Sequence, residues 1–342
     1  MSYAALDNID DAIDATKRFL LPFDLATWLR LAVVMFFVAG GGGGAASYAQ
    51  NAPQFADGFG DSGGGPGGGL DGVSGGEIVS GLPDASVGVA IVVLLALVLL
   101  VALALFFLSP IMEFVFVQSL FEEQVHVRRY FSQNVGNGLR LLAFQLVITL
   151  VGLVLFGGLF LLVVLLLGSG TDLGAAAAGL FVFAIPLFFL YAIVAGTIQG
   201  FTRVFVVPIM LAEDRGLLSA WGRLWNALTG NIGEFLVYLV VSVVLGIGIG
   251  IVGSFASLFA LLIIGIPLGA VAFGVFAIAG GGVVSIAAIA VLGLLFLALF
   301  LLVVNLVQAP LQSFLRYYAM LVLGAIDPDL DPIPEIRASV ES

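Results

Sequence analysis

The sequence predicts an all-α integral membrane protein with six transmembrane helices arranged as three repeated hairpins. Three observations lead to this class. The 342 residues are 61% hydrophobic and only 10% charged, whereas soluble domains carry about 25% charged residues. An internal repeat groups the helices in pairs. Six apolar blocks are each long enough to cross a hydrocarbon core of about 30 Å, at about 25–48, 86–117, 139–167, 176–211, 233–253 and 284–323.

The N-terminal segment 1–24 is predicted to be an amphipathic cytoplasmic helix that Pro22 ends. Its aspartates lie largely away from the apolar residues on the helical wheel. Anionic lipids attract basic faces, and this face is acidic. We therefore expect the helix to pack on the protein's own cytoplasmic side rather than on the membrane surface. The apolar residues fall near helical spacing: Leu6, Ile9, Ile13 and Leu20.

The stretch from about 49 to 85 is rich in glycine and has acidic residues but no Lys or Arg. This composition is typical of a flexible linker. A phosphate-binding loop needs a Gly-Lys-Ser/Thr ending on a helix, which is missing. We expect a Gly-rich loop on the outer side of the membrane.

The basic residues predict the orientation. The connections after the first, third and fifth apolar blocks hold no Lys or Arg, so all 11 bases fall on one side of the membrane. The positive-inside rule makes that side the cytoplasm. The sequence thus predicts a multi-pass protein of the cell membrane with both termini cytoplasmic. The bases are Lys17, Arg18, Arg30, Arg128, Arg129, Arg140, Arg203, Arg215, Arg223, Arg316 and Arg337.

Residues 254–282 are apolar enough to resemble a further span. A seventh span would place Arg316 and Arg337 outside, against every other base. We therefore expect either an extension of the fifth helix or a re-entrant hairpin broken around Gly265 and Pro267. A version with eight short spans stays open.

The repeat is read by setting "QGFTRVFVVPIMLAED" (199–214) above "QSFLRYYAMLVLGAID" (312–327). A third copy, "SPIMEFVFVQSLFEEQ" (109–124), places Glu113 at the position of the matched arginines. Repetition at this period indicates stacked supersecondary units that share one core. At one constant offset, Gln199 matches Gln312, Phe201 matches Phe314, Arg203 matches Arg316, and Asp214 matches Asp327.

The polar island 212–235 follows the second copy, and a similar segment at 128–138 follows the third. We interpret both as short amphipathic elbows at the cytoplasmic interface. Trp221 and Trp225 suit the headgroup layer as interfacial anchors. A functional surface is the alternative, but it would have to explain two copies.

The pattern Ala220-Trp221, Trp225, Gly230-Asn231 and Phe235-Leu236 resembles the membrane domains found beside glycerophosphodiester phosphodiesterases. It is also similar to related six-helix families of unknown function. The acidic, lysine-poor balance resembles proteins of salt-loving archaea. The resemblance implies six helices. Phosphodiesterase activity does not carry over, because the soluble catalytic barrel of that family is missing from this chain.

Three charged residues at equivalent repeat positions form the candidate polar cluster: Glu113, Arg203 and Arg316. Charged residues near spans are functional candidates by default. The cluster could tie three helices together or line a cytoplasmic vestibule. Asn305 and Gln308 lie deeper in the last span, where they could bridge helices or bind a substrate.

No pattern of catalytic or metal-binding residues stands out. The chain has no cysteine and one histidine, which excludes thiolate and histidine-cluster metal sites. The acidic tail 324–342 fails the EF-hand template at Pro332 and Ala338, so we expect a solvated tail. The acidic balance argues against nucleic acid.

We therefore expect a non-enzymatic scaffold or accessory factor without a cofactor. Its partners would be membrane lipid and other membrane proteins. The alternative function is a transporter or channel for a small or lipid-like solute, and a membrane enzyme comes third.

Overall fold

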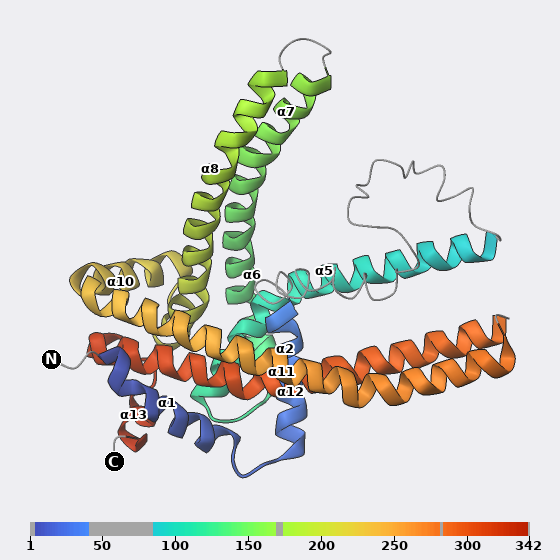
Figure 1. The fold of residues 1–342 in the computed structure, drawn as a ribbon. Coiled ribbons are helices and arrows are strands. Elements are labelled where there is room, and N and C mark those ends of the chain that lie inside the picture. The colour runs from blue at the N-terminus through green and yellow to red at the C-terminus, as the bar shows by residue number, and fades with distance from the viewer. Residues whose placement is uncertain (1–3, 41–84, 169–173, 281–282, 341–342) are drawn as a thin grey trace.

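The structure, a computed structural model, describes residues 4–40, 85–168, 174–280 and 283–340. Every regular element within these ranges is a helix (Figure 1). The predicted helical class is confirmed at this level. The Gly-rich stretch, apart from Ala85, and the end of the first predicted span lie outside the described residues.

The helices follow the predicted apolar blocks closely. The order along the chain is α1 (Ala4–Leu20), α2 (Leu25–Gly40), α5 (Ala85–Phe121), α6 (Val127–Gly152), α7 (Gly158–Gly168), α8 (Gly174–Phe201), α9 (Val207–Ala212), α10 (Leu217–Gly230), α11 (Ile232–Ala279), α12 (Val283–Ile326) and α13 (Pro334–Val340). Two π-helical turns, η1 (Leu153–Gly157) and η2 (Thr202–Val206), join α6 to α7 and α8 to α9. A 3₁₀ turn, η3 (Pro328–Leu330), precedes α13.

Five helical segments of the described chain are long and apolar enough to cross a membrane. The number rises to six if the pair α1 and α2, bent by 117°, is counted as one span. A helical membrane protein is the class that such segments indicate.

The molecule divides into a body and three apolar arms (Figure 1). The body holds the buried core and consists of residues 4–38, 109–144, 201–245 and 304–340. The arms are the outer part of α5 up to residue 108, the pair formed by residues 145–200, and the pair formed by residues 246–303. The described arm residues include no Asp, Glu, Lys or Arg, so every charge of the described chain belongs to the body.

Residues 254–279 continue α11 without a break, with Pro267 inside the helix. The sequence left two main alternatives open for this region. The structure has the extension of the fifth helix and not the re-entrant hairpin. At about 1.5 Å per residue, the 48 residues of α11 measure about 72 Å. A membrane needs only about 20 residues, so one end of α11 belongs to the body and the other forms an arm.

Helix α1 packs on the protein itself, against α12 and α13. The expected contact stripe is half right: Leu20 is buried and Ile9 packs partly buried against the core, but Leu6 and Ile13 are exposed. The small residues Ala12 and Ala15 are buried instead and let α1 approach closely, and Phe19 meets the edge of Tyr317.

The two predicted elbows differ in the structure. The segment 217–230 is a separate helix, α10, that Asn231 ends with non-helical backbone angles. The segment 128–138 is the start of α6 and runs without a break into the following span. The turns before α6 and α10 both contain an acidic residue with positive φ, Glu123 at 50° and Asp214 at 47°.

The C-terminal segment is docked on the body, not solvated as the sequence analysis expects. Leu330, Ile333 and Ile336 are buried in the core. Asp331 pairs with Arg337 at 2.6 Å, and Arg337 also donates to the carbonyl of Leu321 in α12. The acidic side chains thus hold the end of the chain in place.

Candidate functional site

The candidate site is a buried ion pair between α12 and α5. The Arg316 guanidinium contacts Glu113 Oε1 through Nη2, and its Nη1 donates to the main-chain carbonyl of Arg203 in η2. The side chains of Arg316 and Glu113 are only 8% and 4% exposed. The pair therefore joins three elements that lie far apart in the sequence.

Arg203 takes part through its backbone alone. It lies in the π-helical turn η2, where the regular i→i+4 ladder is interrupted, and its carbonyl accepts a side-chain hydrogen bond. Its own side chain is half-buried and forms no ion pair with any described residue. The structure thus brings all three candidate residues together, but only two of them as opposite charges.

Arg316 and Glu113 satisfy each other in a place where neither could be charged alone. Removing a charged group from water costs several kcal/mol, and close pairing with hydrogen bonds offsets that cost. The same environment makes an unpaired Arg316 or Glu113 strongly unfavourable. The geometry therefore indicates a fixed tie between helices, with no described acid or base left over at the pair for proton transfer.

Other arginines tie the ends of the helices to the body. Arg18 of α1 pairs with Glu123 at 2.8 Å in the turn after α5. Arg215 and Arg223 both approach Glu213 after α9, at 2.8 and 3.4 Å. These pairs are partly exposed, so each contributes less than about 1 kcal/mol.

Tyrosines add hydrogen bonds that the sequence analysis did not single out. Tyr317 donates to the carbonyl of Leu120 at 2.9 Å, and Tyr130 donates to Glu122 Oε2 at 2.7 Å. Burial raises the pKa of Glu122, but hydrogen bonds from Tyr130 and Gln118 outweigh this effect and lower it. The sequence did not signal these partners, because a ring alone does not identify its partner; Tyr317 precedes an apolar run, whereas Tyr130 follows Arg128 and Arg129.

The two tryptophans of α10 have different surroundings. Trp221 is half-buried against the core, and its Nε1 donates to Thr202 Oγ1 at 3.1 Å. Trp225 is exposed. Leu217, Ala220, Leu224 and Ala227 form the buried face of this helix.

A family of unknown function, DUF7544, has a profile that matches residues 3–333. The chain belongs to this family. No curated protein and no solved structure matches it. The resemblance to membrane domains beside glycerophosphodiester phosphodiesterases, and to archaeal proteins of salt-rich habitats, therefore stays a prediction for this DUF7544 member.

For this DUF7544 chain, the described ranges contain no group of three His, Cys, Asp or Glu side chains placed to hold a metal ion. The aspartates of the tail have other contacts: Asp327 Oδ1 accepts from the backbone N–H of Asp329 at 3.2 Å. His126 is exposed and lies 3.4 Å from the Tyr130 hydroxyl through Nδ1.

Proposed function

We propose that the chain is a non-enzymatic scaffold or accessory protein of the cell membrane. Its arms lie in lipid and present apolar faces to the spans of other membrane proteins, while its body lies at the cytoplasmic face. The observation that carries this proposal is the exposure of the arms. The most apolar windows of the four spans that follow α5 are only 6–11% buried by the rest of the chain, so large apolar faces stay open to other molecules.

The glycines of α11 support contact with other spans. Cβ atoms added at Gly246, Gly248 or Gly250 would meet nothing within 4 Å. Small residues at such spacing let another helix approach closely in a membrane. These glycines therefore lie on a face of α11 that the described chain leaves open to a partner helix.

The three-hairpin arrangement is part of this proposal. The pairs α7 with α8 and α11 with α12 lie side by side (Figure 1). α2 also lies against α5. Each pair would be one outward helix and one returning helix, with its charged ends gathered in the body.

The proposed orientation rests on the positive-inside rule and on all 11 bases lying in the body. The chain lacks cysteine, so single cysteines report topology directly. A cysteine at Ser62, in the Gly-rich stretch, should react with an impermeant thiol reagent in intact cells. One at Ser132, at the start of α6, should react only after the cells are opened. Reversed labelling would place the body outside.

The scaffold role is tested by photo-crosslinking in native membranes. A benzophenone amino acid at Phe183 or Phe273, both strongly exposed on different arms, should give discrete protein adducts on illumination. The same group at Trp225, exposed on the body, is the positional control. Purified protein in liposomes should release no potassium or glycerol. Lipid adducts alone at both arm positions would contradict the proposal.

A specific observation favours transport as the second candidate. Asn305 Oδ1, Gln308 Oε1 and Ser313 Oγ are buried in α12 and have no hydrogen-bond partner among the described residues. Asn305 does not bridge helices through its amide nitrogen, which donates to Leu301 of the same helix at 2.7 Å. Buried polar atoms inside spans mark solute pathways in many transporters. Saturable solute flux in the liposome assay, abolished by Asn305→Leu, would favour this function.

A further inference from the structure

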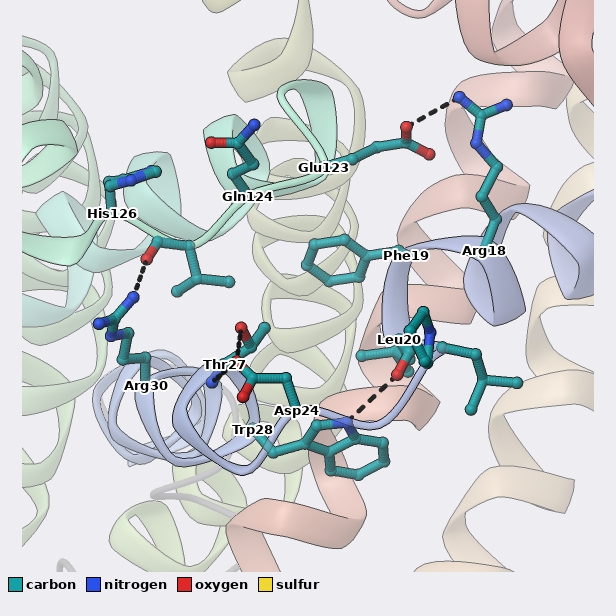
Figure 2. Close-up of a pocket in the computed structure, with 13 residues that line it drawn as sticks. Arg18, Phe19, Leu20, Asp24, Thr27, Trp28, Arg30, Glu123, Gln124 and His126 are labelled. Carbon is teal, nitrogen blue, oxygen red and sulfur yellow. Dashed lines mark hydrogen bonds and ion pairs between the residues drawn. The ribbon is translucent and has the colours of Figure 1, made fainter.

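A pocket of about 310 Å³ lies where the α1–α2 turn faces the α5–α6 turn (Figure 2). Arg18, Asp24 and Arg30 line it from the first turn and its neighbours, and Glu123 and His126 line it from the second. The pocket does not include the Arg316–Glu113 pair and has different chemistry, since its charges reach the surface of the body.

The acidic side chains of this pocket are already engaged. Glu123 pairs with Arg18 at one end of the pocket, as Figure 2 shows. Asp24 Oδ2 accepts the hydroxyl of Thr27 at 2.6 Å and its backbone N–H at 2.9 Å, which caps the start of α2. These hydrogen bonds lower the pKa of Asp24 below its usual value. Neither carboxylate forms an ion pair with Arg30 in the described chain, although the charge of Arg30 also acts on Asp24.

Arg30 retains most of its hydrogen-bonding capacity. Its Nη1 makes one long bond, 3.4 Å, to the carbonyl of Val125, and no ion pair of the described chain includes it. A guanidinium has five N–H donors. Beside it, His126 stands at the N-cap of α6 and makes no side-chain cap hydrogen bond.

Exposed apolar side chains adjoin the pocket, and one of them, Leu21, lines it. Leu21, Phe23 and Leu25, in the same turn as Asp24, are each more than half exposed, and Phe23 lies 5.1 Å from the Trp28 ring between centroids. Exposed apolar side chains beside a cationic group match the boundary between acyl chains and headgroups. A soluble anion would need the cation but not the apolar side chains.

We propose that this pocket binds the phosphate headgroup of an anionic membrane lipid. Arg30 is the main phosphate ligand, because its planar donors fit phosphate oxygens. The acyl chains lie along the exposed apolar side chains of Leu21, Phe23 and Leu25. This inference needs the chain to lie in a membrane but does not depend on the scaffold role.

The test is binding of dioctanoyl phosphatidylglycerol to the full-length protein in neutral detergent, measured by native mass spectrometry. Arg30→Gln should weaken binding about tenfold or more, as expected for a lost charge-assisted hydrogen bond. Arg140→Gln is the matched control, because Arg140 is exposed on α6 outside the pocket and contacts only Asn137 among described residues. It should leave binding unchanged. Unfolding temperatures measured without lipid show that both variants are folded.

Two further ligands distinguish a lipid headgroup from a soluble phosphate. Dioctanoyl phosphatidylcholine should bind more weakly than phosphatidylglycerol, because its headgroup has no net charge. Glycerol phosphate should bind more weakly still, and Phe23→Ser should weaken only the lipid. Equal binding by Arg30→Gln and wild-type protein would overturn the proposal. Equal binding of glycerol phosphate and the lipid would show a soluble-anion site instead and would overturn it as well.

Discussion

Replacing Glu113 with alanine should lower the free energy of unfolding by about 3–5 kcal/mol, the cost of leaving a buried charge without its partner. Arg316 would lose its only carboxylate in a site where its side chain is 8% exposed. The measurement is the unfolding free energy in mixed micelles, with the unfolding temperature as a second readout. Asp14→Ala is the control, since its pair with Lys17 lies at the surface and should contribute under about 1 kcal/mol.

The same experiment separates a two-charge tie from a three-charge cluster. Arg203→Ala keeps the main-chain carbonyl that accepts from Arg316 and should cost far less than Glu113→Ala. In a cluster of three charges, the two substitutions would be similarly damaging. The exchange Glu113→Arg with Arg316→Glu should restore only part of the lost stability, because a glutamate at 316 would face the Arg203 carbonyl.

The repeat pointed to these three positions, but it could not tell which side chains meet. Equivalent positions in two copies lie at the same distance from the helix end, but their side chains need not point in the same direction. The π-helical turn at Thr202–Val206 changes the faces of α8 and α9 relative to each other, and no residue type in that turn signals it. For this reason Arg203 and Arg316 match in the alignment yet make different contacts.

The helices were predictable because long apolar runs have few other structures available in a membrane. The division into body and arms was not. In a chain this apolar, an exposed valine such as Val244 and a buried core valine such as Val206 look alike in sequence, because a contrast between apolar and polar residues marks only a boundary with water. Contact faces were therefore misassigned in part of α1, where Ala12 and Ala15 are buried while Leu6 and Ile13 are exposed.

Close approach of two helices at Gly138 also had no sequence signal, and it gives the second large effect. Gly138 of α6 faces Ile111 of α5. A Cβ atom added at 138 would lie 2.5 Å from the Ile111 Cγ1, 2.7 Å from its Cα and 3.0 Å from its Cβ. Because the Cα belongs to a helix backbone, it cannot move aside as the end of a side chain can.

Gly138→Ala should therefore destabilise the protein by about 1–3 kcal/mol through overpacking, partly offset by the better helix propensity of alanine. Gly136→Ala, two residues earlier in the same helix, is the matched control, because a Cβ atom added there would meet nothing within 4 Å. It should stabilise the helix by up to about 1 kcal/mol. The two substitutions are chemically identical, so their opposite signs in unfolding temperature isolate the α5–α6 contact. A stabilising shift from both would mean that these helices stand further apart than the structure places them, and the α5–α6 side of the body would then need a different arrangement.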